Sequence, residues 1–425
     1  MQNYERGLRC QDVHAGLRNL DPNSGALAEL EDTRVIGMAA TLAASIRGAE
    51  VVKSAQALKS IAAEQLDVDP LAFETVIRVL DDLGFVTSLQ RKGGKTLSFN
   101  ENVPYHENLY EMLGQAWLDR QPSQREEELV LVVDRLATAP VLETEVARVT
   151  GVAKNDVAAV VGLATDADLV QRVMTRSGEG LLYSPFLAFE QPDVIADIVE
   201  KHGTDRLAEE FALVREYQGL PVDASAHPVL LDAIAQGLLT APTVRRPDGF
   251  EQPFAAIPYV TDRGLLTVRK VVLEKALAVI SCVRCGQHFG GATKIHSPTA
   301  IVRSLLDPDR NYTLGAHSSA SRQYELLFRM QVVDFIPSRD WVQVRLRPTE
   351  DNIAAVKLAY ELLAYGQVVD DRLGGDEAVR TLLGSNELYT APIQTTARTR
   401  RQRKRSLSER EFGDLMAQMM DRKPS

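Results

Sequence analysis

The sequence predicts a mainly α-helical fold with small two-stranded β-hairpins, an α+β protein of about four tandem units that ends in a disordered basic tail. The first observation behind this is a pattern of helix, turn, helix and hairpin that recurs along the chain. The second is the composition. The chain has 425 residues, 45% of them hydrophobic and 25% charged, which is typical of an ordinary globular protein.

The first copy of the pattern begins near residue 54. Residues 54–65 have helical spacing, residues 67–70 read as a turn, and Phe73, Ile77 and Leu80 fall on one face of a second helix. The segment FVTSLQRKGGKTLSFNENVP then contains two strand-like runs around a Gly-Gly turn, which predicts a β-hairpin. A helix-turn-helix followed by a hairpin is the order of elements in a winged helix.

The same order returns three more times, most weakly in the third copy. We predict hairpin tips at residues 92–95, 177–180, 247–249 and 338–340, because each lies between strand-like runs and after a helix. In each copy we predict a junction at the same position of the repeat, where a helix ends and a strand begins. The junctions are residues 83–86, 167–170, 236–239 and 330–333.

In this order of elements, residues 34–366 resemble tandem winged helix-turn-helix proteins, a match of architecture that identifies no single family. The resemblance implies DNA binding in a regulatory or DNA-transaction role, or a use of the domains for protein–protein interaction. The predicted segments are an N-terminal segment (1–33), winged helix 1 (34–105), winged helix 2 (106–190), a weak winged helix 3 (191–264), winged helix 4 with its connector and trailing helices (265–383), a linker and basic tail (384–407) and a short amphipathic helix (408–422).

Two surfaces are candidates for DNA binding. The helix of the fourth copy begins with serine, arginine and glutamine, which can reach base edges, whereas the corresponding helix of the first copy is acidic. Each hairpin tip also carries basic residues, which suit phosphate contacts. Helix capping explains the serines equally well, and exposed turns tolerate any charge. The predicted DNA-binding residues are Ser319, Ser321, Arg322, Gln323, Tyr324, Arg339, Arg91, Lys92, Lys95, Arg172, Arg176, Arg245 and Arg246.

Charge is unevenly distributed along the chain. The formal net charge is -10, and residues 398–425 hold nine basic and four acidic residues, so that segment carries +5 and the remainder -15. Its RTRRQRKR run contains no apolar residue, which predicts disorder. Beyond it, Phe412, Leu415, Met416 and Met419 fall on one face of a helix too short to be stable alone. We expect this face to dock on a protein partner or a second copy; a frayed tail without function is the alternative.

The segment SCVRCGQHFGGATKIH gathers four side chains that bind zinc in other proteins, Cys282, Cys285, His288 and His296. Only two residues separate Cys285 from His288, too few for the chain to fold around an ion as structural sites do. We therefore expect no metal and no cofactor, with reduced cysteines at the end of a buried helix. A redox Cys-x-x-Cys stays open as a lesser alternative.

Neither an enzyme nor a membrane protein is indicated. The phosphate-binding, dinucleotide, zincin and hydrolase motifs are absent from the sequence, so we expect no enzyme. No apolar stretch approaches the roughly 18 residues of a membrane span, and the first residues lack a signal-peptide core, which predicts a cytoplasmic location. DNA binding is the favoured function. The alternative is a scaffold or adaptor whose winged helices and C-terminal helix dock partner subunits.

Overall fold

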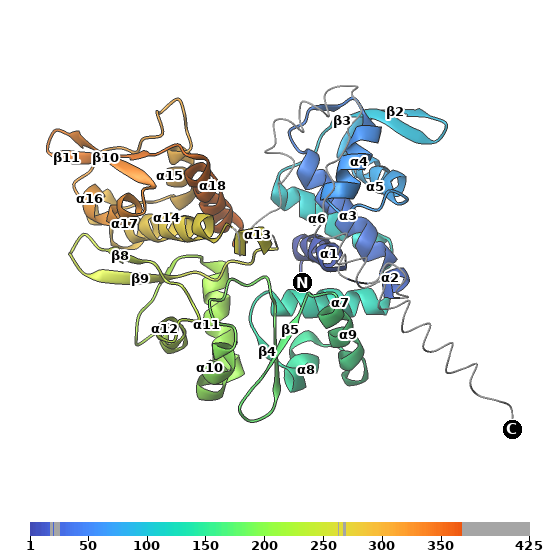
Figure 1. Cartoon of the computed structure of the whole chain (residues 1–425), viewed down its shortest axis with the longest axis horizontal. Coiled ribbons are helices and arrows are strands. Elements are labelled where there is room, and N and C mark those ends of the chain that lie inside the picture. Colours follow the sequence, from blue (N-terminus) through green and yellow to red (C-terminus); the bar gives the residue numbers. More distant parts are fainter. Residues whose placement is uncertain (18–19, 21–25, 262, 267–268, 368–425) are drawn as a thin grey trace, which may run out of the picture. The chain divides into compact units, whose positions relative to one another are not determined.

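The computed structural model describes residues 1–17, 20, 26–261, 263–266 and 269–367. Within these residues helices predominate, and the strands form small antiparallel sheets of two or three strands (Figure 1). The predicted mixture of helices and β-hairpins is therefore confirmed. The described chain divides into two compact units. Of the described residues, unit 1 contains Met1–Arg135 and Val146–Gln171, and unit 2 contains Leu136–Glu145 and the residues from Arg172 to Gln367. These units are larger than the predicted repeats, whose borders stay a prediction.

Unit 1 is built from helices and one hairpin. Its helices are α1 (Asn3–Leu17), α2 (Ala26–Glu29), α3 (Glu31–Ile46), α4 (Ala55–Gln65), α5 (Phe73–Asp82), α6 (His106–Asp119), α7 (Gln124–Leu136), α8 (Val146–Thr150) and α9 (Lys154–Asp166). Its strands are β1 (Val51–Val52), β2 (Val86–Lys92) and β3 (Lys95–Glu101).

Helix α1 packs against both α3 and α6 in unit 1. Glycines permit the close approach of α1 and α6, since a Cβ at Gly7 would overlap the carbonyl oxygen of Tyr110 and one at Gly114 would overlap that of Asn3. No element was predicted in residues 1–33. Their structure gives the reason, because most of α1 is buried although its sequence is largely polar.

Charged side chains of α1 are buried together with partners. Arg9 is only 3% exposed; it pairs with Asp12, and its Nε lies 3.0 Å from Oδ1 of Asp134. Tyr110 donates its hydroxyl proton to Gln11. A buried charge is tolerated when it is paired and hydrogen-bonded, and loss of one partner leaves an uncompensated charge behind. The position of α1 therefore depends on residues far along the chain.

The first repeat has the elements that the sequence predicts. Helix α4 begins after Ser54, whose Oγ accepts a hydrogen bond from the Ala57 N–H at 3.2 Å, as an N-cap should. A turn connects α4 to α5, and β2 and β3 form the hairpin. Strand β3 also pairs with β1, so the sheet order is β1-β3-β2.

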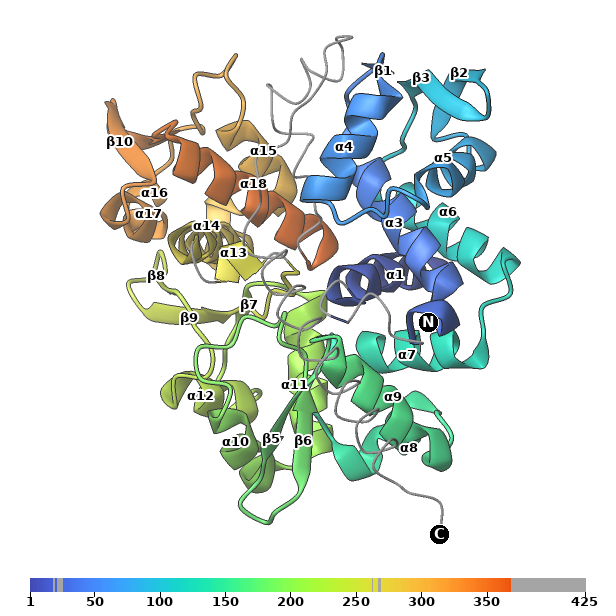
Figure 2. The ribbon, with the colours of Figure 1, turned by 45° about the vertical axis from the view of Figure 1, so that its right-hand side comes forward.

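Unit 2 contains the remaining elements. Its helices are α10 (Val194–His202), α11 (Thr204–Glu216), α12 (Pro228–Ala235), α13 (Arg263–Leu266), α14 (Lys270–Phe289), α15 (Pro298–Leu305), α16 (Ala320–Gln323), α17 (Glu325–Arg329) and α18 (Glu350–Tyr365). Its strands are β4 (Val141–Leu142), β5 (Gln171–Met174), β6 (Gly180–Tyr183), β7 (Leu220–Pro221), β8 (Thr243–Arg245), β9 (Glu251–Ala255), β10 (Val333–Ser338) and β11 (Trp341–Leu346). Helix α14 forms much of the apolar core of this unit and packs against α18 (Figure 2).

The sheets of unit 2 repeat the strand order of the first sheet. Their orders are β4-β6-β5 and β7-β9-β8, so the last strand lies in the middle each time. In the fourth case, Thr313 and His317 pair with β11, which places residues 313–317 in the position of the first strand. The third and fourth copies differ from the first two, which have two α-helices, α4 and α5 or α8 and α9, between their first two strands. Between β7 and β8 the chain forms one helix, α12, and before β10 only α16 and α17, separated by Tyr324.

The four predicted junctions share one backbone geometry. Their second residues have positive φ: Gly84 71°, Asp168 60°, Gly237 73° and Gln331 57°. The next residue then donates its N–H to the carbonyl five positions back, as in a Schellman cap: Phe85 to Leu80 at 2.8 Å, Leu169 to Ala164 at 2.9 Å, Leu238 to Ala233 at 2.8 Å and Val332 to Leu327 at 2.9 Å. A helix ends at each junction as predicted, and a strand follows within a few residues, latest in the third copy.

The predicted hairpin tips are also confirmed. Each tip joins two neighbouring strands of a sheet, β2 to β3, β5 to β6, β8 to β9 and β10 to β11. At the first tip Gly93 and Gly94 both have positive φ, 59° and 77°, which a tight two-residue hairpin turn requires. Local turn chemistry was therefore sufficient to locate these four turns.

Candidate nucleic-acid interface

The predicted reading helix of the fourth copy corresponds to α16 and α17. Ser321 and Arg322 are exposed there, and Ser319 is half-buried. Gln323 and Tyr324 are 0% and 1% exposed, and the Gln323 Nε2 donates to the Cys282 carbonyl at 3.1 Å. These two side chains belong to the core of unit 2, so they do not face solvent where a duplex could reach them. Helical geometry explains the difference, since the residues of one turn point in different directions around the helix axis and only some of them face solvent.

A neighbouring hairpin covers part of the exposed face of α16 and α17. The Arg322 Nη1 donates to the carbonyl of Pro247, in the tip between β8 and β9, at 2.8 Å. Arg245 on β8 lies 4.0 Å from the Glu325 carboxylate on α17. Arg322 and Arg245 were both predicted to contact DNA. In the structure Arg322 contacts the β8–β9 hairpin and Arg245 contacts α17. The two predicted surfaces therefore meet within one unit.

Most basic hairpin tips of unit 2 have acidic partners. Arg172 lies 2.6 Å from Glu143, and Arg176 lies 2.6 Å from Asp197. Arg246 pairs with Asp248, and its guanidinium stacks over the Phe289 ring with 4.1 Å to the centroid. Paired carboxylates offset the positive charge that a phosphate would meet. Arg339 differs, because it is exposed and forms no ion pair with any described residue.

The β2–β3 hairpin is an exposed basic element of unit 1. It extends beyond α5 (Figure 1), and every residue from Gln90 to Lys95 is exposed. Among the described residues Lys92 and Lys95 have no ion-pair partner, and Arg91 is 3.3 Å from Asp81 in a pair that is solvated on both sides. Exposed pairs of this kind contribute little stability and exchange readily for other partners. The basic side chains of this hairpin are therefore free to contact an anionic partner such as a phosphate.

The helix next to this hairpin is acidic and partly engaged by it. Glu74 on α5 accepts hydrogen bonds from the backbone N–H of Thr96 at 3.1 Å and from its hydroxyl at 2.8 Å. Asp82 at the end of α5 is exposed. Phosphate repulsion disfavours such a helix in a groove, whereas its contact with β3 stabilises the base of the hairpin. In the first copy, the hairpin rather than the helix is the candidate.

The cysteine and histidine cluster lies mostly on α14. Cys282 and Cys285 are buried in this helix. Burial raises the pKa of the Cys285 thiol to about 12 and also holds the pKa of the Cys282 thiol well above its usual range. His288 Nε2 lies 2.8 Å from the Tyr217 hydroxyl, and His296 is exposed. Within the described residues no three potential ligands gather around a common point. The predicted buried helix is confirmed, and its two thiols are protonated at neutral pH.

The predicted partner-docking residues Phe412, Leu415, Met416 and Met419 lie outside the described residues, as do the linker and the basic tail. In the part of the chain that the structure describes, no helix is both long enough and apolar enough to span a membrane. Comparison of the chain with protein-family models, curated proteins and solved structures gives no match.

Proposed function

We propose that this chain is a nonenzymatic protein of four winged-helix units that binds duplex DNA, with the β2–β3 hairpin as its principal phosphate contact. The observation that carries the proposal is the exposed tip with Arg91, Lys92 and Lys95, two of which have no acidic partner among the described residues. Lysines at a projecting turn contact phosphates without reading bases. Binding is then largely independent of sequence.

The repeated architecture supports four related units. The three three-stranded sheets each place their last strand in the middle, and isolated bridges put residues 313–317 beside β11 in the same way. Each helix-to-strand corner has the same hydrogen bond and a residue in the left-handed conformation at the same position. In the fourth unit the interface reduces to Arg339 at the β10–β11 tip and Ser321 on α16, because Gln323 and Tyr324 are buried. The hairpins are thus better candidates than the helices in both the first and the fourth unit.

The test is the affinity of the full chain for a random duplex, measured by fluorescence anisotropy over a range of NaCl concentrations. We expect Lys92→Ser with Lys95→Ser to weaken binding to all duplexes alike and to reduce the log–log salt slope by about one unit for each lysine. Lys294→Ser with Lys357→Ser is the matched control, since both lysines are exposed in unit 2 and the change in net charge is the same. Equal affinities for the two double variants would refute the proposal.

A protein scaffold is the second candidate, favoured by large apolar side chains on the surface. Leu71 before α5 is 92% exposed, Phe250 at the β8–β9 tip 70% and Trp341 on β11 54%. Large apolar and aromatic side chains are the groups that protein interfaces bury. A scaffold would bind no random duplex at ordinary salt, so the same titration separates the two functions.

A further inference from the structure

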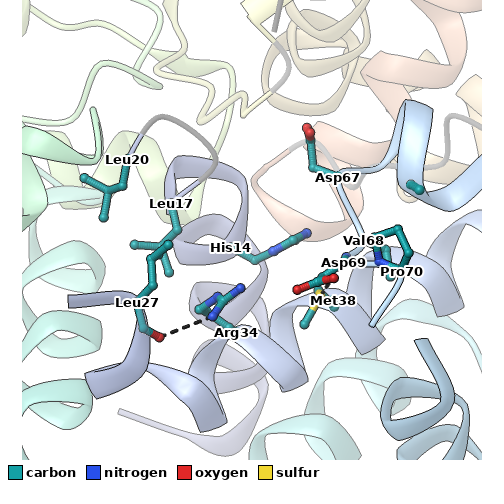
Figure 3. A pocket seen from close by; sticks show the side chains of 11 residues that line it. His14, Leu17, Leu20, Leu27, Arg34, Met38, Asp67, Val68, Asp69 and Pro70 are labelled. Carbon is teal, nitrogen blue, oxygen red and sulfur yellow. Dashed lines mark hydrogen bonds between the residues drawn. The ribbon is translucent and has the colours of Figure 1, made fainter. Parts of the chain in front are cut away.

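Unit 1 contains a cavity of about 220 Å³ that lies outside the hairpin interface. Most of its lining comes from α1, α3 and the turn that joins α4 to α5. Leu20, Leu27 of α2 and Ala63 of α4 complete it. Figure 3 shows Arg34 beside Leu27 and the turn residues Asp69 and Pro70 near Met38.

The turn that forms one wall is held in place by both neighbouring helices. His14 Nε2 on α1 lies 3.3 Å from the Leu66 carbonyl oxygen, and the Asp69 N–H donates to Met38 Sδ on α3 at 3.4 Å. Asp69 Oδ1 accepts the Leu71 N–H at 2.8 Å, which fixes the carboxylate against its own turn. The wall is therefore preformed, and a ligand would meet it with little reorganisation.

The charged side chains of the lining are one arginine, Arg34, and two carboxylates, Asp67 and Asp69. Arg34 Nη1 donates to the Leu27 carbonyl at 3.3 Å, which orients the guanidinium. Among the described residues neither Arg34 nor Asp69 forms an ion pair, although both are partly buried and line the same space. Partly buried charges gain from a partner of opposite sign. A ligand that carries a carboxylate and an ammonium group would supply both partners.

Aliphatic side chains form much of the remaining lining, beside His14 and Asp67, and restrict the size of the ligand. Leu17, Leu20, Leu27 and Val68 provide aliphatic contacts. A volume of 220 Å³ corresponds to about seven water molecules, which suits a ligand of the size of an amino acid. We propose that this cavity binds a free L-α-amino acid with an aliphatic side chain. Its carboxylate contacts Arg34, its ammonium group contacts Asp69, and its side chain packs on the leucines.

Binding is tested on the full chain without DNA, so the outcome is separate from that of the proposed function. Thermal unfolding is followed with each of the common L-amino acids, and the ligands that raise the midpoint are titrated by calorimetry. We expect leucine, isoleucine, valine or methionine to bind. N-acetyl-leucine lacks the ammonium charge and leucinamide lacks the carboxylate, so each should bind at least tenfold more weakly than leucine.

Three substitutions locate the site. Arg34→Met and Asp69→Asn each remove one charge, and the asparagine keeps the oxygen that accepts the Leu71 N–H. Ala63→Met fills the cavity without changing charge. Each should lower the affinity at least tenfold, while Arg78→Met, at an exposed position of α5 outside the cavity, should leave it unchanged. No midpoint shift with any amino acid, equal binding of leucinamide, or unchanged affinity in both Arg34→Met and Ala63→Met would overturn the proposal.

Discussion

Gln331, at the corner after α17, holds a left-handed backbone conformation that glycine adopts at the corners after α5 and α12. A Cβ in this conformation is strained, so Gln331→Gly should raise the free energy of unfolding by about 0.5–1 kcal/mol after the added freedom of the unfolded chain is counted. Gly84→Ala is the reverse change at the corner after α5, where φ is 71° and no atom lies within 4 Å of the new Cβ. It should lower the free energy of unfolding by about 1 kcal/mol.

Urea denaturation of the two variants measures both changes. Because the surroundings of Gly84 are open, a lower free energy of unfolding in Gly84→Ala reports backbone strain rather than a steric clash. A neutral Gly84→Ala, or a destabilised Gln331→Gly, would contradict the shared geometry of the corners.

His106, the first residue of α6, makes the stability of the protein depend on pH. Burial, with a smaller effect of the Arg47 guanidinium, lowers the pKa of His106 from 6.5 to about 4. Between these values the unfolded chain binds a proton that the folded chain does not, so stability falls as the pH falls from 6.5 to 4. The loss reaches about 3 kcal/mol. Stability is retained in full above pH 6.5.

Chemical denaturation at a series of pH values checks this prediction. His106→Gln should remove part of the loss between pH 6.5 and 4, because glutamine does not titrate. His296→Gln, at an exposed position, should leave the wild-type profile unchanged. If both variants keep that profile, another group causes the acid sensitivity.

At the scale of elements, the contact between α1 and α6 depends on glycine. Gly114 lies inside α6, where a Cβ would overlap the carbonyl oxygen of Asn3, so Gly114→Ala should lower the free energy of unfolding by about 1–3 kcal/mol. Gly162 lies inside α9 with open space around it, and Gly162→Ala should raise stability by up to about 1 kcal/mol. Thermal or urea unfolding compares the two. A stabilised Gly114→Ala would mean that the helices have room to separate.

The hairpins were predictable and α1 was not. Gly93-Gly94 and Pro247 to Gly249 favour their turns through backbone preferences that act over a few residues. Helix α1 is buried by its partners instead: Arg9 reaches Asp134, 125 positions away. The local sequence of a polar helix does not indicate a partner so distant in the chain.

At the scale of the whole molecule, the charge asymmetry of the sequence predicts a separate role for the C-terminal segment. Deleting residues 397–425 removes a net +5 from a chain whose remainder carries -15. We expect an unchanged thermal midpoint and either a lower affinity for random duplex or the loss of a protein partner, because a basic, non-apolar run contributes no core. A midpoint lowered by several degrees would place Phe412 and Leu415 in the core and exclude partner docking.

Comparison of this deletion with Lys92→Ser and Lys95→Ser separates two sources of electrostatic binding. The deletion and the double variant should each lower the salt slope, and their effects should add if the two segments contact different phosphates. If the double substitution causes no further loss of DNA affinity in the chain that lacks residues 397–425, all DNA binding belongs to the tail.

The sequence by itself determined the hairpin tips, the helix-to-strand corners and the charge distribution, because turn residues and helix caps act through neighbouring backbone atoms. Tertiary structure decided which of the predicted DNA-contact side chains are exposed and unpaired. Gln323 and Tyr324 have the chemistry of base readers and are buried in the core, while Arg172 and Arg176 are matched by carboxylates. Burial and ion pairing depend on segments distant in sequence, and so does the cavity between Arg34 and Asp69. Only the folded chain brings these groups together.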